Sequence, residues 1–153
     1  MSGSVPAAGA GTAQRTREAV ERYIAALNSG DPDRIAGRVT ADFHNEHTAS
    51  LGRSVRGRAA YRERLTGFLA EFEELRYEVE DLIVDGDRAA VAYLMTFRWS
   101  GAAHRPRIRI RGMFRFRVGG GEIAHRVDYW DSGTFQRQST EQRRWRTRPE
   151  QDG

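Results

Sequence analysis

The spacing of apolar residues changes part-way along the chain, and this change limits the folds that the chain can adopt. In the first half they recur every three or four positions, and one such stripe consists of Val20, Tyr23, Ile24 and Leu27. From Leu75 onward they alternate with polar residues, which is the pattern of a strand with one buried face. The sequence therefore predicts an α+β fold with its helices first and its sheet second.

Three helices are expected before residue 73. The first carries the stripe just given and ends at Gly30. Asp31 and Pro32 have the residue types of an N-cap and a first helical position, so a second helix is expected from there to about Val39. A third helix follows Gly57 and has an apolar stripe of Tyr61, Leu65, Phe68, Leu69 and Phe72.

Four longer strands are expected after these helices, as an antiparallel meander. They cover about residues 75–84, 91–99, 107–118 and 122–131. Glycine-containing turns join the first two strands at residues 85–87 and the last two at 119–121, because glycine adopts the positive φ angles of hairpin turns. A short strand is also expected at about 43–47. The fold would then be three N-terminal helices packed on a mainly antiparallel sheet.

The basic residues are all arginine: the chain has 25 of them, no lysine and no cysteine. This excludes disulfides, thiol nucleophiles, sulfur-based zinc sites and Schiff-base chemistry. The net charge of +4 points to nucleic acid or an anionic surface as a partner. However, the charge comes from the two ends, since residues 18–136 carry 18 arginines and 18 acidic residues.

An arginine stripe in the strand 107–118 also raises the question of nucleic acid. Acidic residues of the strand 75–84 could neutralise it across the sheet, so we expect no nucleic-acid binding. This face is expected to be solvated or to form a dimer. The arginines are Arg107, Arg109, Arg111, Arg115 and Arg117, and the acidic residues are Glu78, Glu80 and Asp81.

The composition of the two ends predicts tails around one domain. Residues 1–12 are rich in Ser, Gly and Ala, and residues 137–153 in Gln and Arg. We therefore expect a disordered tail at 1–12, one domain at 13–136 and a flexible basic tail at 137–153. Residues 1–14 have neither the positive start of a secretory signal nor a long apolar run. A cytoplasmic protein with no membrane partner is expected.

Two segments resemble known families. Residues 20–31, VERYIAALNSGD, resemble the first helix of bacterial ketosteroid isomerases. Residues 121–131, GEIAHRVDYWD, are similar to the last strand of limonene epoxide hydrolase and of SnoaL-like polyketide cyclases. These families belong to the nuclear-transport-factor-2-like superfamily, a cone-shaped barrel in which helices wrap a curved sheet around an apolar pocket. The resemblance covers about residues 13–136 and implies this fold, which serves isomerases, hydrolases, cyclases and binders alike.

The resemblance implies three catalytic positions. Tyr23 stands where the isomerases have a tyrosine that donates a hydrogen bond to a developing oxyanion, and His47 stands where they have the carboxylate base. Asp128 stands where the hydrolases have a catalytic aspartate. Gly112 replaces the isomerases' second oxyanion donor, and the hydrolases' partner arginine and second aspartate are missing as well. The chain therefore carries part of each family's catalytic set.

Strand alternation places Arg126, Asp128 and Trp130 on one face of the last strand. A neighbouring carboxylate can orient the tautomer of a histidine and stabilise its cation, so His47 and Asp128 could transfer a proton, with Tyr23 opposite as donor. The candidate substrate-contacting residues are Asn45, Tyr93, Met95, Phe97, Gly112, Phe114, Arg126 and Trp130.

The same residues have plainer interpretations. Tyr23 could simply pack in the core, and His47 could be a solvated strand end. His44 and His47 lie near Glu46, but with no cysteine and no helical or loop signature around them we expect no metal site. No cofactor is expected either.

The expected function is that of a cofactor-independent acid/base isomerase or cyclase. Its substrate would be an apolar polyketide-, steroid- or terpenoid-like molecule of bacterial secondary metabolism, and the enzyme would be a homodimer. One alternative is an epoxide hydrolase or epoxide-opening cyclase, with Asp128 as base and Tyr23 or His47 as acid. Another is a non-catalytic ligand-binding or dimerisation module, which has little reason to place ionisable groups around one cavity.

Overall fold

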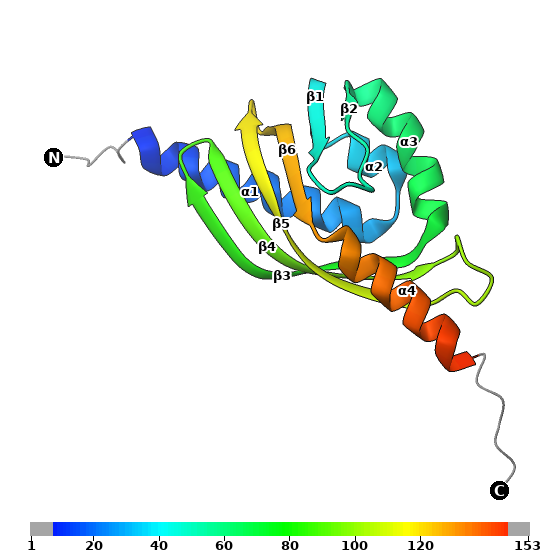
Figure 1. Ribbon diagram of the computed structural model, residues 1–153. Coiled ribbons are helices and arrows are strands. Elements are labelled where there is room, and N and C mark those ends of the chain that lie inside the picture. Colours follow the sequence, from blue (N-terminus) through cyan, green and yellow to red (C-terminus); the bar gives the residue numbers. More distant parts are fainter. Residues whose placement is uncertain (1–7, 147–153) are drawn as a thin grey trace, which may run out of the picture.

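Six strands form a single curved sheet in a computed structural model of the protein, which describes residues 8–146 (Figure 1). Their order across the sheet is β2-β1-β6-β5-β4-β3. The strands are β1 (Val39–His47), β2 (Val55–Arg56), β3 (Phe72–Asp85), β4 (Arg88–Trp99), β5 (Arg107–Gly119) and β6 (Glu122–Trp130). The helices are α1 (Ala8–Ser29), α2 (Pro32–Ala36), α3 (Arg58–Glu71) and α4 (Ser132–Arg146).

The strands β3 to β6 form the antiparallel meander that the alternating pattern predicts. Both expected hairpin turns are present, with positive φ angles of 58° at Gly86 and of 59° and 80° at Gly120 and Gly121. A side chain would strain the backbone at these angles, so glycine sets the positions of the turns. The α+β class and the curved, mainly antiparallel sheet are confirmed.

The strand β1 is longer than expected and pairs with β6 in a parallel sense. The second helix ends at Ala36 because Gly37 caps it, instead of continuing to about Val39. Val39 begins β1 instead, and its side chain is fully buried. A parallel pair can join segments that are far apart in the sequence, so the local pattern alone does not predict it.

The sheet does not close into a barrel, because the edge strands β2 and β3 do not pair with each other among the residues described. The helix α3 packs against β1, β2 and β3, so it fills the gap that strand pairing would close in a barrel. The result is an open cone. The space inside this cone is bounded by the sheet on one side and by α3 on the other.

Both ends of the domain are more helical than the composition suggests. The helix α1 begins at Ala8, although disorder is expected over residues 1–12, and α4 continues to Arg146, although a flexible tail is expected from residue 137. The expectations for residues 1–7 and 147–153 lie outside the described residues. No helix among residues 8–146 is both long enough and apolar enough to cross a membrane.

Specific contacts explain why α4 forms. The carboxylate of Asp131 accepts hydrogen bonds from the Gly133 N–H at 2.8 Å and from the Thr134 hydroxyl at 2.9 Å, which caps the helix. The amide group of Gln138 pairs with both the N–H and the C=O of Arg109, each at 2.7 Å. This side chain therefore satisfies backbone groups of β5 beyond the end of β6.

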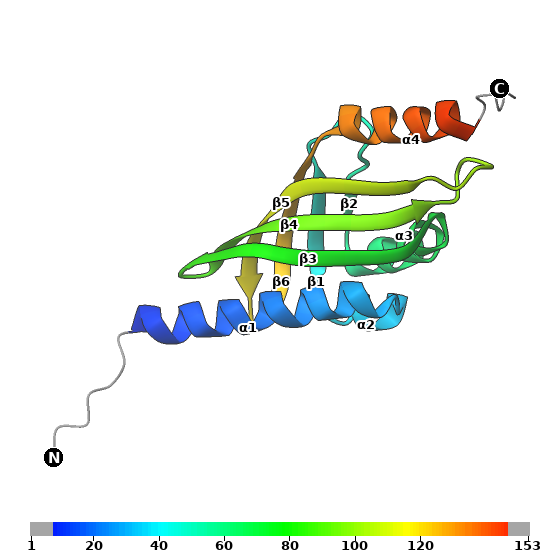
Figure 2. The same cartoon turned by 90° about the horizontal axis from the view of Figure 1, so that it is seen from below.

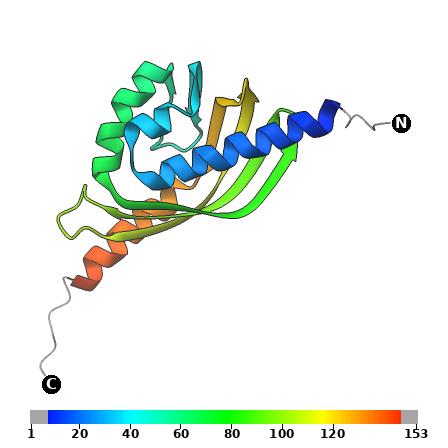
Figure 3. The same cartoon turned by 180° about the vertical axis from the view of Figure 1, so that it is seen from behind.

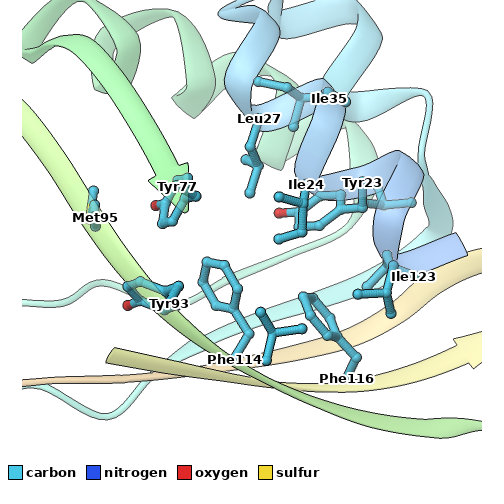
Figure 4. Packing of buried hydrophobic residues seen from close by; sticks show 14 of the residues in the cluster. Tyr23, Ile24, Leu27, Ile35, Tyr77, Tyr93, Met95, Phe114, Phe116 and Ile123 are labelled. Atoms are coloured by element: carbon cyan, nitrogen blue, oxygen red, sulfur yellow. The ribbon is translucent and has the colours of Figure 1, made fainter. Parts of the chain in front are cut away.

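The core lies between α1 and the concave face of the sheet. Tyr23, Ile24 and Leu27 point from α1 toward Phe114 and Phe116 of β5 (Figure 4). Each of these side chains is almost fully buried, and such burial stabilises a fold by about 1.5–3 kcal/mol per residue. Seen from below and from behind, α1 and α4 lie on opposite sides of the long strands (Figures 2 and 3). The helix α1 thus lies on one side of the long strands and α4 on the other.

The arginine stripe on the outer face of β5 is partly neutralised across the sheet. Arg111 forms an ion pair of 2.7 Å with Glu80, and Arg107 forms one of 3.4 Å with Glu74. The expected neutralisation is therefore present at Glu80. Glu74 takes part as well, although the sequence pattern did not single it out.

Candidate functional site

A cavity of about 630 Å³ lies between the concave face of the sheet and the helices α3 and α4. Small-molecule sites in proteins have volumes of about 300–1,000 Å³. Most of the wall is apolar, and includes Leu65, Phe68, Phe97, Ile110, Trp130 and Phe135. The polar residues that line the cavity from β1, α3 and β6 are Asn45, His47, Tyr61, Arg64, Glu71, Arg126 and Asp128.

The parallel pairing of β1 with β6 brings His47 and Asp128 together. These two residues are direct neighbours in the register, and His47 Nδ1 lies 3.6 Å from Asp128 Oδ2. His47 Nδ1 is buried and has no hydrogen-bond partner among the described residues, although it lies within ion-pair distance of the Asp128 carboxylate. The expected pair is thus present, and a small movement would turn it into a hydrogen bond.

Burial shifts the pKa values of Asp128 and His47 in opposite directions. Burial raises the pKa of Asp128, and the charge of Arg126 and the hydrogen bond from Tyr93 oppose this rise only in part. Burial and the positive charges of Arg126 and Arg64 lower the pKa of His47 to about 3. The imidazole is therefore neutral at neutral pH, and Asp128 binds a proton more readily than an aspartate in water does.

The Asp128 carboxylate is held from behind by Tyr93. The hydroxyl of Tyr93 donates a hydrogen bond to Asp128 Oδ1 at 2.6 Å, so Oδ2 is left for His47 and the cavity. Gly112 makes this contact possible, because a Cβ atom there would overlap the Tyr93 ring. Tyr93, Gly112 and Phe114, which were candidates for substrate contact, do not border the cavity. They form the layer that supports its polar end.

Arg126 is a buried cation at the edge of the cavity, with only 5% of its surface exposed. Its Nε donates to Asn45 Oδ1 at 2.9 Å and its Nη1 donates to the Tyr23 hydroxyl at 2.8 Å. The guanidinium group also lies 4.9 Å from the centre of the Phe114 ring. A guanidinium group keeps its charge at all ordinary pH values, so a positive charge stands permanently beside Asp128.

Tyr23 does not border the cavity, although the resemblance implied a substrate contact there. Its side chain is completely buried, and its hydroxyl lies 2.6 Å from the hydroxyl of Tyr61, which does line the cavity. Because Arg126 already donates to the Tyr23 oxygen, the Tyr23 proton is best satisfied by donating to Tyr61. The Tyr61 proton is then free to point into the cavity.

The other candidates for substrate contact, Asn45, Met95, Phe97 and Trp130, line the cavity as the sequence predicted. Trp130 and Asp128 share the inward face of β6, opposite Gly112 and Phe114 of β5. This agrees with the face assignment from strand alternation.

The sequence did not reveal the contribution of α3 and α4. Tyr61, Arg64 and Glu71 reach the cavity from α3, and Phe135 reaches it from α4. The only signal for Tyr61 was its place in an apolar helical stripe, which indicates burial and gives no information about a hydroxyl in a cavity.

The sequence pattern of the SnoaL-like domain family matches residues 20–126, which is more than half of the chain. The protein belongs to the SnoaL-like domain family. This confirms the resemblance to the nuclear-transport-factor-2-like superfamily that the first helix and the last strand indicated. No curated protein matches the sequence of this SnoaL-like protein.

Solved structures similar to this SnoaL-like protein include several proteins that are named as cyclases or epoxide hydrolases. One is SalBIII, an epoxide hydrolase/cyclase-like enzyme in pyran ring formation in the polyether salinomycin, at 27% identity and a TM-score of 0.68 over 76% of this chain and 91% of that one. Another is a SnoaL-like polyketide cyclase, so named on a provisional basis, from Shewanella denitrificans, at 16% identity and a TM-score of 0.75 over 82% and 97% of the two chains. An LEH-like epoxide hydrolase of M. tuberculosis matches at 17% identity and a TM-score of 0.70, over 84% and 94%.

Proposed function

We propose that this SnoaL-like protein is a cofactor-independent acid/base enzyme that isomerises or cyclises an apolar small molecule. The observation that carries the proposal is the His47–Asp128 pair, which borders an otherwise mostly apolar cavity of about 630 Å³. An ionisable pair is expensive to bury, so its presence in a ligand-sized cavity favours catalysis over packing or simple binding.

Asp128 is the proton acceptor in this proposal. A histidine with a pKa of about 3 is a weak base, whereas burial raises the pKa of Asp128 and makes this carboxylate the stronger base of the two. His47 then acts as a neutral partner whose Nδ1 orients Asp128 Oδ2. This reverses the roles suggested by the resemblance, which placed the base at His47.

Tyr61 and Arg126 stabilise the negative charge that develops on the substrate. The Tyr61 hydroxyl donates a hydrogen bond to the substrate oxygen. The fixed charge of Arg126 supports this donor indirectly, because Arg126 donates to the Tyr23 hydroxyl, which is hydrogen-bonded to Tyr61. One donor of this kind typically contributes about 3–4 kcal/mol to the transition state. The role of hydrogen-bond donor is thus assigned to Tyr61, which lines the cavity, in place of Tyr23, which does not.

Opening of an epoxide by an internal hydroxyl is the second candidate reaction. It is favoured by the similarity to SalBIII, an epoxide hydrolase/cyclase-like enzyme in pyran ring formation, and by the Asp128 carboxylate beside the neutral His47. Asp128 would take the proton of the attacking hydroxyl as the new C–O bond forms. Tyr61 would donate its proton to the oxygen released when the epoxide C–O bond breaks.

A panel of enones, polyketide-like β-dicarbonyl compounds and hydroxy-epoxides, each incubated with the protein in D₂O, tests the proposal. Deuterium incorporation beside a carbonyl indicates isomerase or aldol chemistry, and ring closure of a hydroxy-epoxide indicates the second reaction. Ligands that bind the cavity without exchange or turnover under any of these conditions would support the non-catalytic module instead.

We further infer a place in bacterial secondary metabolism and a homodimeric state for the enzyme. The first rests on the polyether context named for SalBIII. The second rests on the outer face of β5 and β6, where Met113 and Tyr129 pair across the strands and are each 41% exposed. Light scattering of the protein, with Met113→Glu as the variant that should dissociate the dimer, tests this state.

A further inference from the structure

Two histidines and a glutamate meet on the outer face of the sheet, on the strands that carry the catalytic pair. Side chains alternate along β1, so His44 and Glu46 point away from the cavity that His47 borders. The parallel register places His125 of β6 directly beside His44. The cluster therefore joins residues 81 positions apart in the chain, from positions 44 to 125.

The geometry of this cluster is close to that of a metal site. The rings of His44 and His125 are parallel, with centres 4.8 Å apart, and His125 Nε2 lies 3.7 Å from Glu46 Oε2. One possible ligand atom from each residue lies within 4.8 Å of the other two. Ligand atoms lie about 2 Å from a zinc ion, so two of them are about 4 Å apart at most. Small rotations of the rings, which the broad χ2 preference of histidine allows, would bring the atoms to this spacing.

Within the part of the chain that the structure describes, the ring nitrogen Nε2 of His125 lacks the hydrogen-bond partner that a buried polar atom normally has. His125 Nε2 is buried and has no hydrogen-bond partner among the described residues. A buried nitrogen without a partner, pointing toward a carboxylate, is the arrangement that a bound cation would satisfy.

We propose that His44, Glu46 and His125 bind a divalent transition-metal ion such as Zn²⁺. Two histidines and one glutamate, with water in the remaining positions, are a ligand set found in known zinc sites. The charges of Arg115 and Arg117 on the neighbouring strand act on His125 and oppose any cation. They disfavour Mg²⁺ and Ca²⁺ most, because these ions are held by oxygen ligands and charge, whereas imidazole nitrogens bind Zn²⁺, Ni²⁺ and Cu²⁺.

The bound ion would join β1 to β6 directly behind the candidate active site. Asn45 and His47 alternate with its β1 ligands, and Arg126 follows His125 on β6. A metal bridge between the two strands would fix the register that places His47 beside Asp128. His44 and His47 are close in the sequence but lie on opposite faces of β1, and the third ligand comes from the distant strand β6.

Calorimetric titration of the protein, prepared without an affinity tag, with ZnCl₂ tests the proposal. We expect one Zn²⁺ per chain, no heat of binding with MgCl₂, and a rise in the unfolding temperature with Zn²⁺. His125→Gln and Glu46→Gln should each weaken the affinity by at least about tenfold. The matched control His104→Gln, which changes a histidine on the loop between β4 and β5, should bind Zn²⁺ as the wild type does.

Three results would overturn the proposal. They are the absence of Zn²⁺ binding by the wild type, unchanged affinity in both ligand variants, and loss of binding in His47→Gln while His125→Gln still binds. The last result would place the ion in the cavity. Glu46 is 39% exposed, so its replacement by glutamine is expected to leave the fold intact, which circular dichroism without metal can verify.

Discussion

His47 and Asp128 are neighbours because β1 and β6 run parallel in a register that aligns the two residues, with Nδ1 and Oδ2 3.6 Å apart. The two strands reach this contact from distant parts of the chain, and neither residue has a local signal for the other. The pair, the buried cation Arg126 and the Tyr61 hydroxyl all border a cavity whose wall is mostly apolar. Substitution of single residues can separate the roles of these groups.

Tyr61→Phe and Tyr23→Phe should have different effects. Tyr61→Phe removes the hydroxyl that reaches the cavity, so kcat should fall by about 10²–10³-fold. It also leaves the buried Tyr23 proton without its acceptor, so the free energy of unfolding should fall by about 1 kcal/mol or more. Tyr23→Phe leaves the buried Nη1 of Arg126 without its acceptor, so the free energy of unfolding should fall by about 1–3 kcal/mol. Urea unfolding and steady-state kinetics of both variants check this. A larger kinetic effect in Tyr23→Phe, with Tyr61→Phe fully active, would restore the donor to Tyr23.

Tyr93→Phe should change the pH dependence of the reaction. The hydrogen bond from Tyr93 opposes the rise in the pKa of Asp128, so its removal should move that pKa still higher. The base is then deprotonated only at higher pH. The acidic limb of the kcat/KM profile is therefore expected to shift to higher pH.

The matched control for this measurement is Tyr129→Phe, which changes an exposed tyrosine of the outer face. Its pH profile should coincide with that of the wild type. If the two variants shift the profile equally, Tyr93 does not act on the titrating group.

Neutral His47 should contribute to the free energy of unfolding at neutral pH, and this contribution should be lost as the pH falls. Its folded pKa of about 3 lies below the ordinary 6.5, so the unfolded chain binds more protons between these values. This contribution to stability is complete above about pH 6.5 and is lost progressively as the pH falls toward 3. Asp128 acts in the opposite direction, because its raised pKa favours protonation in the folded state.

The variant His47→Gln isolates the histidine contribution. Relative to this variant, the wild type should lose free energy of unfolding between pH 6.5 and pH 4, as measured by urea titration at each pH. Replacement of His104, which lies on the loop between β4 and β5, should not produce this difference. Parallel curves for the wild type and His47→Gln would mean that His47 is not buried in its neutral form.

The fold and part of the site follow from local patterns in the sequence. The change from helical to alternating spacing predicted the helices α1 to α3 and the meander. Alternation alone placed Arg126, Asp128 and Trp130 on one face, because the direction of a side chain in a strand depends only on its position. The N-cap at Asp31 and the glycine turns were also predictable, because both depend on residue types that are adjacent in the sequence.

The remaining features depend on contacts between distant segments. Tyr23 and Tyr61 both lie on apolar helical stripes, and only the placement of α3 against the sheet decides which hydroxyl meets the cavity. The helix α4 has few apolar residues, so its anchor Phe135 and the pairing of Gln138 with β5 gave no periodic signal. The neighbour of His44 is His125, a residue of another strand, and this too follows from the register.

The central claim is that Asp128 is the base of an acid/base enzyme, and Asp128→Asn tests it most directly. This change removes the proton acceptor and keeps an oxygen for the Tyr93 hydroxyl, so the fold should persist. Once a substrate is found, deuterium exchange and turnover should fall by about 10²–10⁴-fold, whereas the exposed control Asp81→Asn should retain both. Equal rates in Asp128→Asn and the wild type would contradict the claim.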